Sequence, residues 1–167
     1  EAFTIVKAAR DRYDGALRPG LDSGPGGNPF DELECGKFYA RAQSSWSLLI
    51  ASQGLVLDGP AGVLGFRPKW QPDDHRSFFT VPEGWGLFVQ KREAGKQAER
   101  IELRHGRAKL TELVFATPFA AKQCTVLHNG RGRPATLQAD GADGVRVTLG
   151  QPAEVTEGDV LEVALSA

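Results

Sequence analysis

The sequence lacks several features that would identify a class of protein at once. Its 167 residues contain no methionine, only two cysteines, and no apolar run near the roughly 18 residues that a membrane-spanning helix needs. Neither charge is in excess, since 20 Lys and Arg stand against 21 Asp and Glu for a net charge of -1. Nucleic-acid binders normally carry a basic excess that neutralises phosphates. We therefore expect neither a nucleic-acid partner nor a membrane span.

Metal and cofactor motifs are missing as well. Cys35 and Cys124 do not have the CxxC spacing of a zinc site, and they are either two free thiols or one bridge. The glycines match neither a Walker loop nor a dinucleotide fingerprint. His75 follows two aspartates in a Pro-flanked connector, where a solvated turn is favoured over a metal site. The sequence thus predicts no cofactor and no metal.

Apolar residues recur at helical spacing in the first third of the chain. The pattern predicts a helix over residues 2–13, ended by Gly15, and a second over 37–52, ended by Gly54. A Gly- and Pro-rich surface loop, residues 18–29, separates them. Because apolar spacing starts at the third residue with no capping residue before it, we interpret the chain as a piece or processed part of something larger.

The second predicted helix has the composition of a packed helix. Trp46, Leu49 and Ile50 share an apolar stripe, and small Ala and Ser residues fill the middle, which lets neighbouring helices approach closely. Two helices cannot cover this stripe between them, so we expect other helices to pack on it.

Beyond residue 76 the hydrophobic period becomes two, the period of β-strands. Turn dipeptides separate the segments, and apolar residues share one face in several of them, which indicates an antiparallel sheet with one buried side. The predicted strands are residues 78–80, 85–91, 100–105, 109–115, 124–128, 135–139, 145–149 and 160–165, with turns at 105–107, 129–130, 143–144 and 157–159.

These patterns divide the chain into three parts. Residues 1–57 form a helical segment, residues 58–75 a connector with at most a short strand at 63–66, and residues 76–167 an antiparallel β region. A helical part followed by an antiparallel part is typical of an α+β chain.

Three carboxylates lie within four positions ahead of the second helix, at Asp31, Glu32 and Glu34. Acidic residues at a helix N-terminus complement the helix dipole, which explains the cluster without any function. The alternative is a sugar-binding lip, in which carboxylates and Arg41 hydrogen-bond to vicinal hydroxyls while nearby aromatic rings cover the C–H groups of the sugar. On an unbroken helix Glu34 and Arg41, seven residues apart, share a face. If Gly36 interrupts the helix, Glu32 folds back towards Arg41 instead.

The same stretch closely resembles glycoside hydrolase family 116, the family of the non-lysosomal glucosylceramidase and of bacterial β-glucosidases. The resemblance rests on RYDG at 12–15, NPFDELECG at 28–36 and YARAQSSW at 39–46. It continues through DGP at 58–60, LGF at 64–66, FFT at 78–80 and GWG at 84–86, and it fades after about residue 92.

The resemblance implies both a fold and residue roles. It implies that the helices are the closing helices of an (α/α)6 barrel, followed by the antiparallel β-rich region. It also implies that Glu32 and Arg41 contact the glycone of a β-glucoside that the whole enzyme hydrolyses with retention. The family's nucleophile and acid/base lie upstream of the matched region. This chain would therefore supply no catalytic residue, be inactive alone, and need the upstream catalytic part as its partner.

The chain departs from the family pattern at several positions. Phe38 stands where the family has His, Asp31 where it has Asn, and Gln43 where it has Met, while residues 19–27 are an insertion. These departures imply an altered pocket rim.

A second hypothesis is a non-catalytic carbohydrate-binding or scaffolding module. A complete enzyme built on the acidic cluster is disfavoured, because acids on one short segment cannot flank both sides of a glycosidic bond.

Trp85, between two glycines, has two interpretations. Its ring could be a platform for a sugar, but the sequence favours a core residue that seals the sheet against the helices. His105 and His128 lie near predicted turns, so we expect both at the surface.

Overall fold

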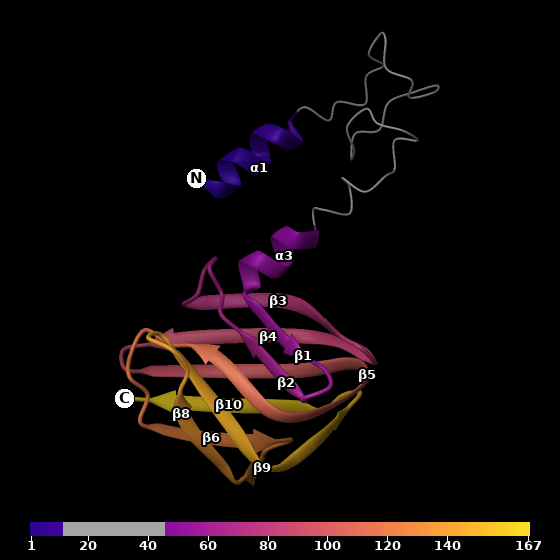
Figure 1. Cartoon of the computed structure of the whole chain (residues 1–167), viewed down its shortest axis with the longest axis vertical. Helices are drawn as coiled ribbons and strands as arrows, with labels where there is room; N and C mark the ends of the chain where they lie inside the picture. The colour runs from indigo at the N-terminus through magenta and orange to yellow at the C-terminus, as the bar shows by residue number, and fades with distance from the viewer. Residues whose placement is uncertain (12–45) are drawn as a thin grey trace. The chain divides into compact units, whose positions relative to one another are not determined.

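The structure, a computed structural model, describes residues 1–11 and 46–167 (Figure 1). The chain divides into two compact units, Glu1–Leu48 and Leu49–Ala167. Two helices lie in the described ranges, α1 (Ala2–Arg10) and α3 (Trp46–Gln53). Neither is long and apolar enough to cross a membrane.

Strands make up most of the second unit. Their bounds are β1 (Leu55–Asp58), β2 (Val63–Phe66), β3 (Asp74–Val81), β4 (Gly84–Glu93), β5 (Lys96–Ala116), β6 (Gln123–His128), β7 (Arg131–Arg133), β8 (Ala135–Ala139), β9 (Gly144–Thr156) and β10 (Val160–Ser166).

The long strand β5 belongs to two sheets. Its first half pairs with β4 and β10 in a sheet of order β3-β4-β5-β10-β6-β7. Its second half pairs with β2 and β9 in a sheet of order β1-β2-β5-β9-β8. In the described residues the β2–β5 pair is parallel and the other strand pairs are antiparallel. Figure 1 shows β1, β2 and β9 running across β3, β4 and β10.

The hydrophobic core lies between the inner faces of the two sheets. Phe66 of β2 stacks on Phe88 of β4 with ring centroids 3.8 Å apart, and Phe115 of β5 lies 6.3 Å from Phe88. All three side chains are fully buried. Alternating burial along β3, one residue in and the next out, is what a sheet with one packed face requires. The unit is therefore a two-sheet β-sandwich.

The switch of β5 between sheets occurs at Gly106. The β4 ladder ends at this residue and the β9 ladder begins at Arg107. Gly106 has φ of 80°, and a Cβ atom there would lie 1.9 Å from the carbonyl oxygen of Glu83. Only glycine combines this backbone conformation with so close an approach. Gly106 therefore fixes the position at which β5 passes from one sheet to the other.

The prediction of closing helices of an (α/α)6 barrel within an α+β fold is wrong for the described residues, which are mostly β-sheet with two short helices. The side chains of Trp46, Leu49 and Ile50 in α3 are 74%, 37% and 51% exposed. From Leu55 onward the chain forms the β1–β2 hairpin, and β2 pairs with β5. The described helical residues are therefore followed directly by sheet, not by further helices.

Several local predictions can be compared with the structure. The short strand at 63–66 is confirmed as β2, and the turn at 129–130 is confirmed by the β6–β7 hairpin around it. The turn at 157–159 is confirmed by a hydrogen bond from the Asp159 amide to the Thr156 carbonyl oxygen, in the connection between β9 and β10. The turn at 105–107 is wrong, because the strands predicted on either side of it are one bent strand, β5. Helix α1 ends at Arg10, and the predicted continuation to residue 13 lies partly outside the described residues.

Candidate functional site

The predicted glycone-binding residues, Glu32 and Arg41, lie outside the described residues. The same is true of the neighbouring acids Asp31 and Glu34 and of Cys35. Their roles stay predictions.

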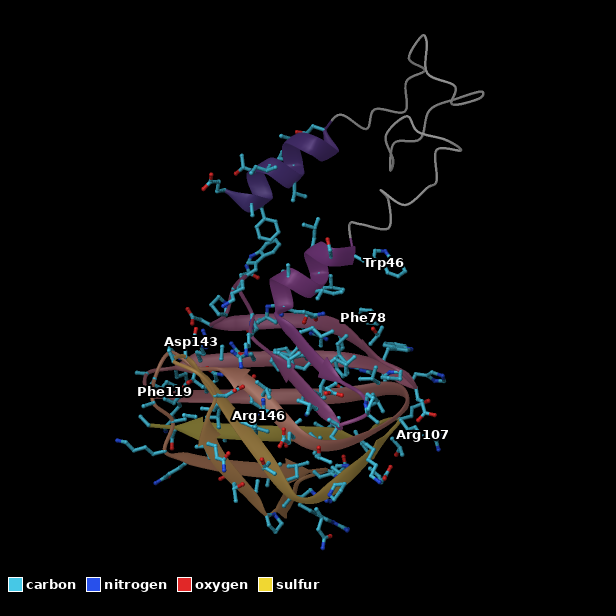
Figure 2. The ribbon with its side chains drawn as sticks, viewed as in Figure 1. Trp46, Phe78, Arg107, Phe119, Asp143 and Arg146 are labelled. Carbon is cyan, nitrogen blue, oxygen red and sulfur yellow. The ribbon has the colours of Figure 1, made fainter. Side chains whose placement is uncertain are left out.

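Among the described residues, an open hollow of about 520 Å³ lies at the end of the β3–β4 hairpin. Its volume is in the range of ligand sites, roughly 300 to 1,000 Å³. Phe78 of β3 and Trp85 of β4 form its aromatic part, with ring centroids 5.8 Å apart and planes inclined by 46°. Their side chains are 43% and 41% exposed. Figure 2 labels Phe78 at the surface of the sandwich. The other lining residues are Thr80, Val81, Pro82, Glu83, Gly84 and His105.

Strand register puts three of these side chains in one row. Thr80 of β3 pairs with Trp85 of β4, and Trp85 pairs with His105 of β5. Directly opposed residues on neighbouring strands share a face of the sheet. Phe78, two residues before Thr80, lies on the same face. The outer face of this sheet therefore presents a hydroxyl, an indole and an imidazole side by side next to a phenyl ring.

Two glycines and a β-bulge hold Trp85 in place. A Cβ atom at Gly84 would lie 2.3 Å from the carbonyl oxygen of His105, and one at Gly86 would lie 2.2 Å from that of Glu102. The β4–β5 register shifts between Trp85 and Gly86. Bulges locally re-aim side chains, and here the bulge adjoins an exposed tryptophan. The backbone on both sides of Trp85 therefore packs closely against β5, which fixes the position from which the indole ring projects.

Charged residues at the rim occur in matched pairs. Arg107 donates to both carboxylate oxygens of Glu83, from Nε at 3.0 Å and from a terminal nitrogen at 2.9 Å. This hydrogen bonding and the charge of Arg107 lower the pKa of Glu83, which keeps the carboxylate ionised at neutral pH. The Nδ1 atom of His105 lies 3.0 Å from a carboxylate oxygen of Glu157. Each basic group at this rim thus has an acidic partner.

A second hollow, of about 360 Å³, adjoins the first and shares Val81, Pro82 and Glu83 with it. Asp58, Gly59 and Pro60 line its far side. Three segments that carry the later part of the family resemblance, residues 58–60, 78–80 and 84–86, therefore contribute to the two adjoining hollows.

A buried polar row crosses the inner face of the same sheet. His75 pairs with Gln90, and Gln90 pairs with Glu99, in register on β3, β4 and β5. The Glu99 carboxyl is 2% exposed and accepts a hydrogen bond from Gln97, while its Oε2 atom has no partner in the described residues. Burial raises the pKa of Glu99 to about 8, against the opposing effects of Gln97 and Arg92. Glu99 is therefore mainly protonated at neutral pH.

The structure corrects three expectations about single residues. The sequence favours a core position for Trp85, and this is wrong. Phe79 and Phe88 occupy the inner face of the sheet, and Trp85 points outward. His75 is not in a solvated turn but lies buried on β3, where Nδ1 is 2.9 Å from the carbonyl oxygen of Trp70. His105 is exposed as expected, whereas the side chain of His128 is only 15% exposed.

The described residues contain no cluster of three or more His, Cys, Asp or Glu side chains that could hold a metal ion. Within the described residues Cys124 on β6 forms no disulfide, and partial burial raises the pKa of its thiol.

No protein-family model matches the chain, and no curated protein matches it. Among solved structures, the chain is similar to a GH127 β-L-arabinofuranosidase from Geobacillus stearothermophilus T6, with 14% identity over 75% of this chain and a TM-score of 0.44. It is also similar to an α-L-rhamnosidase from Dictyoglumus thermophilum, with 11% identity over 75% of this chain and a TM-score of 0.41. The match covers 19% and 13% of those two chains, which are both glycoside hydrolases.

Proposed function

We propose that this chain is the substrate-binding portion of a retaining, β-glucosidase-like glycoside hydrolase. In this proposal Glu32 and Arg41 hold the glycone of a β-glucoside, and the nucleophile and the acid/base belong to an upstream part of the same enzyme. The observation that carries the proposal is the long run over residues 28–46, whose acids, arginine and aromatic residues follow the family 116 pattern.

The chemistry of this pair suits a sugar. An ionised Glu32 accepts hydrogen bonds from two hydroxyls, and the Arg41 guanidinium donates to others in a fixed fork. Such contacts do not break the glycosidic bond, but they position it, and binding energy remote from the reacting atoms lowers the barrier. Retention additionally needs two carboxyl groups about 5 to 5.5 Å apart across the scissile bond. The upstream part would supply that pair.

The test combines the chain with the upstream part, or uses the enzyme that contains both, and follows hydrolysis of an aryl β-glucoside. We expect Glu32→Ala and Arg41→Ala each to lower kcat/KM by at least about tenfold, equivalent to ~1.4 kcal/mol of transition-state binding. Asp31→Asn is the matched control, because it restores the family's own residue beside Glu32, and it should keep the activity. Full activity in both alanine variants would refute the assigned roles.

The alternative is a non-catalytic carbohydrate-binding or scaffolding module. One observation favours it, since residues 49–167 form a compact unit with its own core and an exposed aromatic hollow. A monomeric chain that binds a saccharide, but never restores hydrolysis when the upstream part is added, would support the module over the enzyme portion.

A further inference from the structure

The outer face of the β3–β4 hairpin carries an exposed aromatic pair that the core does not use. The inner face of the hairpin is filled by Phe79 and Phe88, both at most 1% exposed. Phe78 and Trp85 lie on the opposite face, where 43% and 41% of their surface stays in contact with water. A close-packed pair of glycines and a bulge nevertheless fix the indole there.

We propose that this hollow is a saccharide-binding subsite, in which one pyranose ring lies against Trp85. The indole face covers the C–H groups of the sugar, and the Phe78 ring, 5.8 Å away and inclined by 46°, forms a second wall. The residues assigned to this subsite, Phe78, Thr80, Trp85 and His105, are different residues from Glu32 and Arg41. This inference rests on the proposed function only in that both assume that the chain binds a saccharide.

The polar neighbours of Trp85 have the spacing that such a ligand needs. Thr80 and His105 stand on the strands to either side of it, two interstrand distances or about 9 to 10 Å apart. A pyranose ring lying on the indole between them extends its hydroxyls towards both. The Thr80 hydroxyl can donate or accept, and because His105 directs Nδ1 to Glu157, its Nε2 is the ring nitrogen that a sugar hydroxyl can reach.

The charges at the rim favour a neutral ligand. Arg107 donates two hydrogen bonds to the carboxylate of Glu83, and the His105 ring lies within hydrogen-bond distance of the Glu157 carboxylate. A phosphate or carboxylate ligand would have to compete with these acids for the basic groups, whereas an uncharged polyol can bond to the remaining donors and lone pairs. Aromatic faces with a few polar groups and no net charge fit a neutral sugar better than a nucleotide or an acidic peptide.

The test is an NMR titration of the full chain with methyl β-D-glucopyranoside and with cellotriose, followed at the indole N–H signals of its tryptophans. We expect the Trp85 signal to shift saturably, and Trp85→Ala to weaken binding at least tenfold. Trp70→Ala is the matched control, because Trp70 is 48% exposed and does not line the hollow. It should bind like the wild type, and Trp85→Phe should retain part of the affinity.

Three results would overturn the inference. They are the absence of a saturable shift with both sugars, equal affinity in the Trp85→Ala variant, and a Trp85 signal that moves only when the upstream part is added. The last result would mean that the aromatic pair packs against protein. Binding should also be unchanged between low and high salt, because the ligand is uncharged. Since the titration involves no hydrolysis, its outcome is independent of the activity of the Glu32 and Arg41 variants.

Discussion

Replacing the buried carboxyl of Glu99 by an amide should make the stability of the protein less dependent on pH. Glu99 is 2% exposed on the inner face of the sandwich, and its Oε2 atom has no hydrogen-bond partner in the described residues. Burial raises its pKa from 4.5 to about 8. Between these two values the unfolded chain releases a proton that the folded protein keeps, so the free energy of unfolding falls as the pH rises. A Gln side chain has the same shape and no proton to release.

The size of the effect follows from the two pKa values. Each pH unit within the window costs ~1.4 kcal/mol, so from pH 5 to pH 8 the wild type should lose about 3 to 4 kcal/mol relative to Glu99→Gln. Below pH 4.5 Glu99 is neutral in both states, and the two proteins should have similar stability. Other ionisable groups titrate alike in both proteins and cancel in the comparison.

The measurement is urea unfolding followed by circular dichroism, for both proteins, at pH 5 and pH 8. Glu162→Gln, whose side chain is 44% exposed on β10, controls for the change in net charge. If the wild type and Glu99→Gln lose stability in parallel between the two pH values, Glu99 is already ionised in the folded protein. The explanation by burial would then be wrong.

The remaining predictions concern the bend, the core and one turn. Gly106→Ala should lower the free energy of unfolding by at least about 2 kcal/mol, measured by urea unfolding, because φ is 80° and the new methyl group meets a backbone carbonyl. Gly130→Ala is its control, since φ is 74° there and no atom lies within 4 Å, so the loss should be about half as large or less. Phe88→Ala should cost about 3 to 5 kcal/mol in the same assay, as large-to-small changes in a packed core do. Asp159 has a pKa lowered to about 2 by hydrogen bonds from Asn129 and from the backbone, so its contribution exists above pH 4 and disappears as the pH falls through 2. Asp159→Ala should therefore lower the Tm more at pH 7 than at pH 2, and an equal decrease at both would contradict this account.

Short-range features of the fold could be predicted from the sequence. The Asn129–Gly130 turn is correct because both residues take positive φ, which these residue types tolerate better than others. Alternation along residues 160–165 identifies the buried face of β10 for the same local reason. Gly106 misled the prediction, because a glycine with positive φ is equally typical of a hairpin turn and of a bend within one strand. Whether Gly106 forms a hairpin turn or a bend depends on how β5 pairs with β4 and β9, two strands that lie elsewhere in the chain.

Longer-range features could not be predicted. Whether Trp85 faces the core or the solvent depends on the register of β4 against β5, including a bulge that no dipeptide signal announces. His75 was assigned to a turn from its neighbours, but its burial comes from strand pairing with β4 and from contacts to Trp70 and Ser77. The glycone-binding roles of Glu32 and Arg41 stay predictions, which rest on the sequence run alone.

The participation of β5 in both sheets determines how the sandwich unfolds. Because this strand has ladder partners on both sides along much of its length, neither sheet can lose it and survive as a separate folded piece. Its amide protons should accordingly be among the last to exchange with deuterium, and both sheets should melt in a single cooperative step. New chain ends would be tolerated at the exposed β6–β7 hairpin tip, whereas a cut within β5 would abolish the fold.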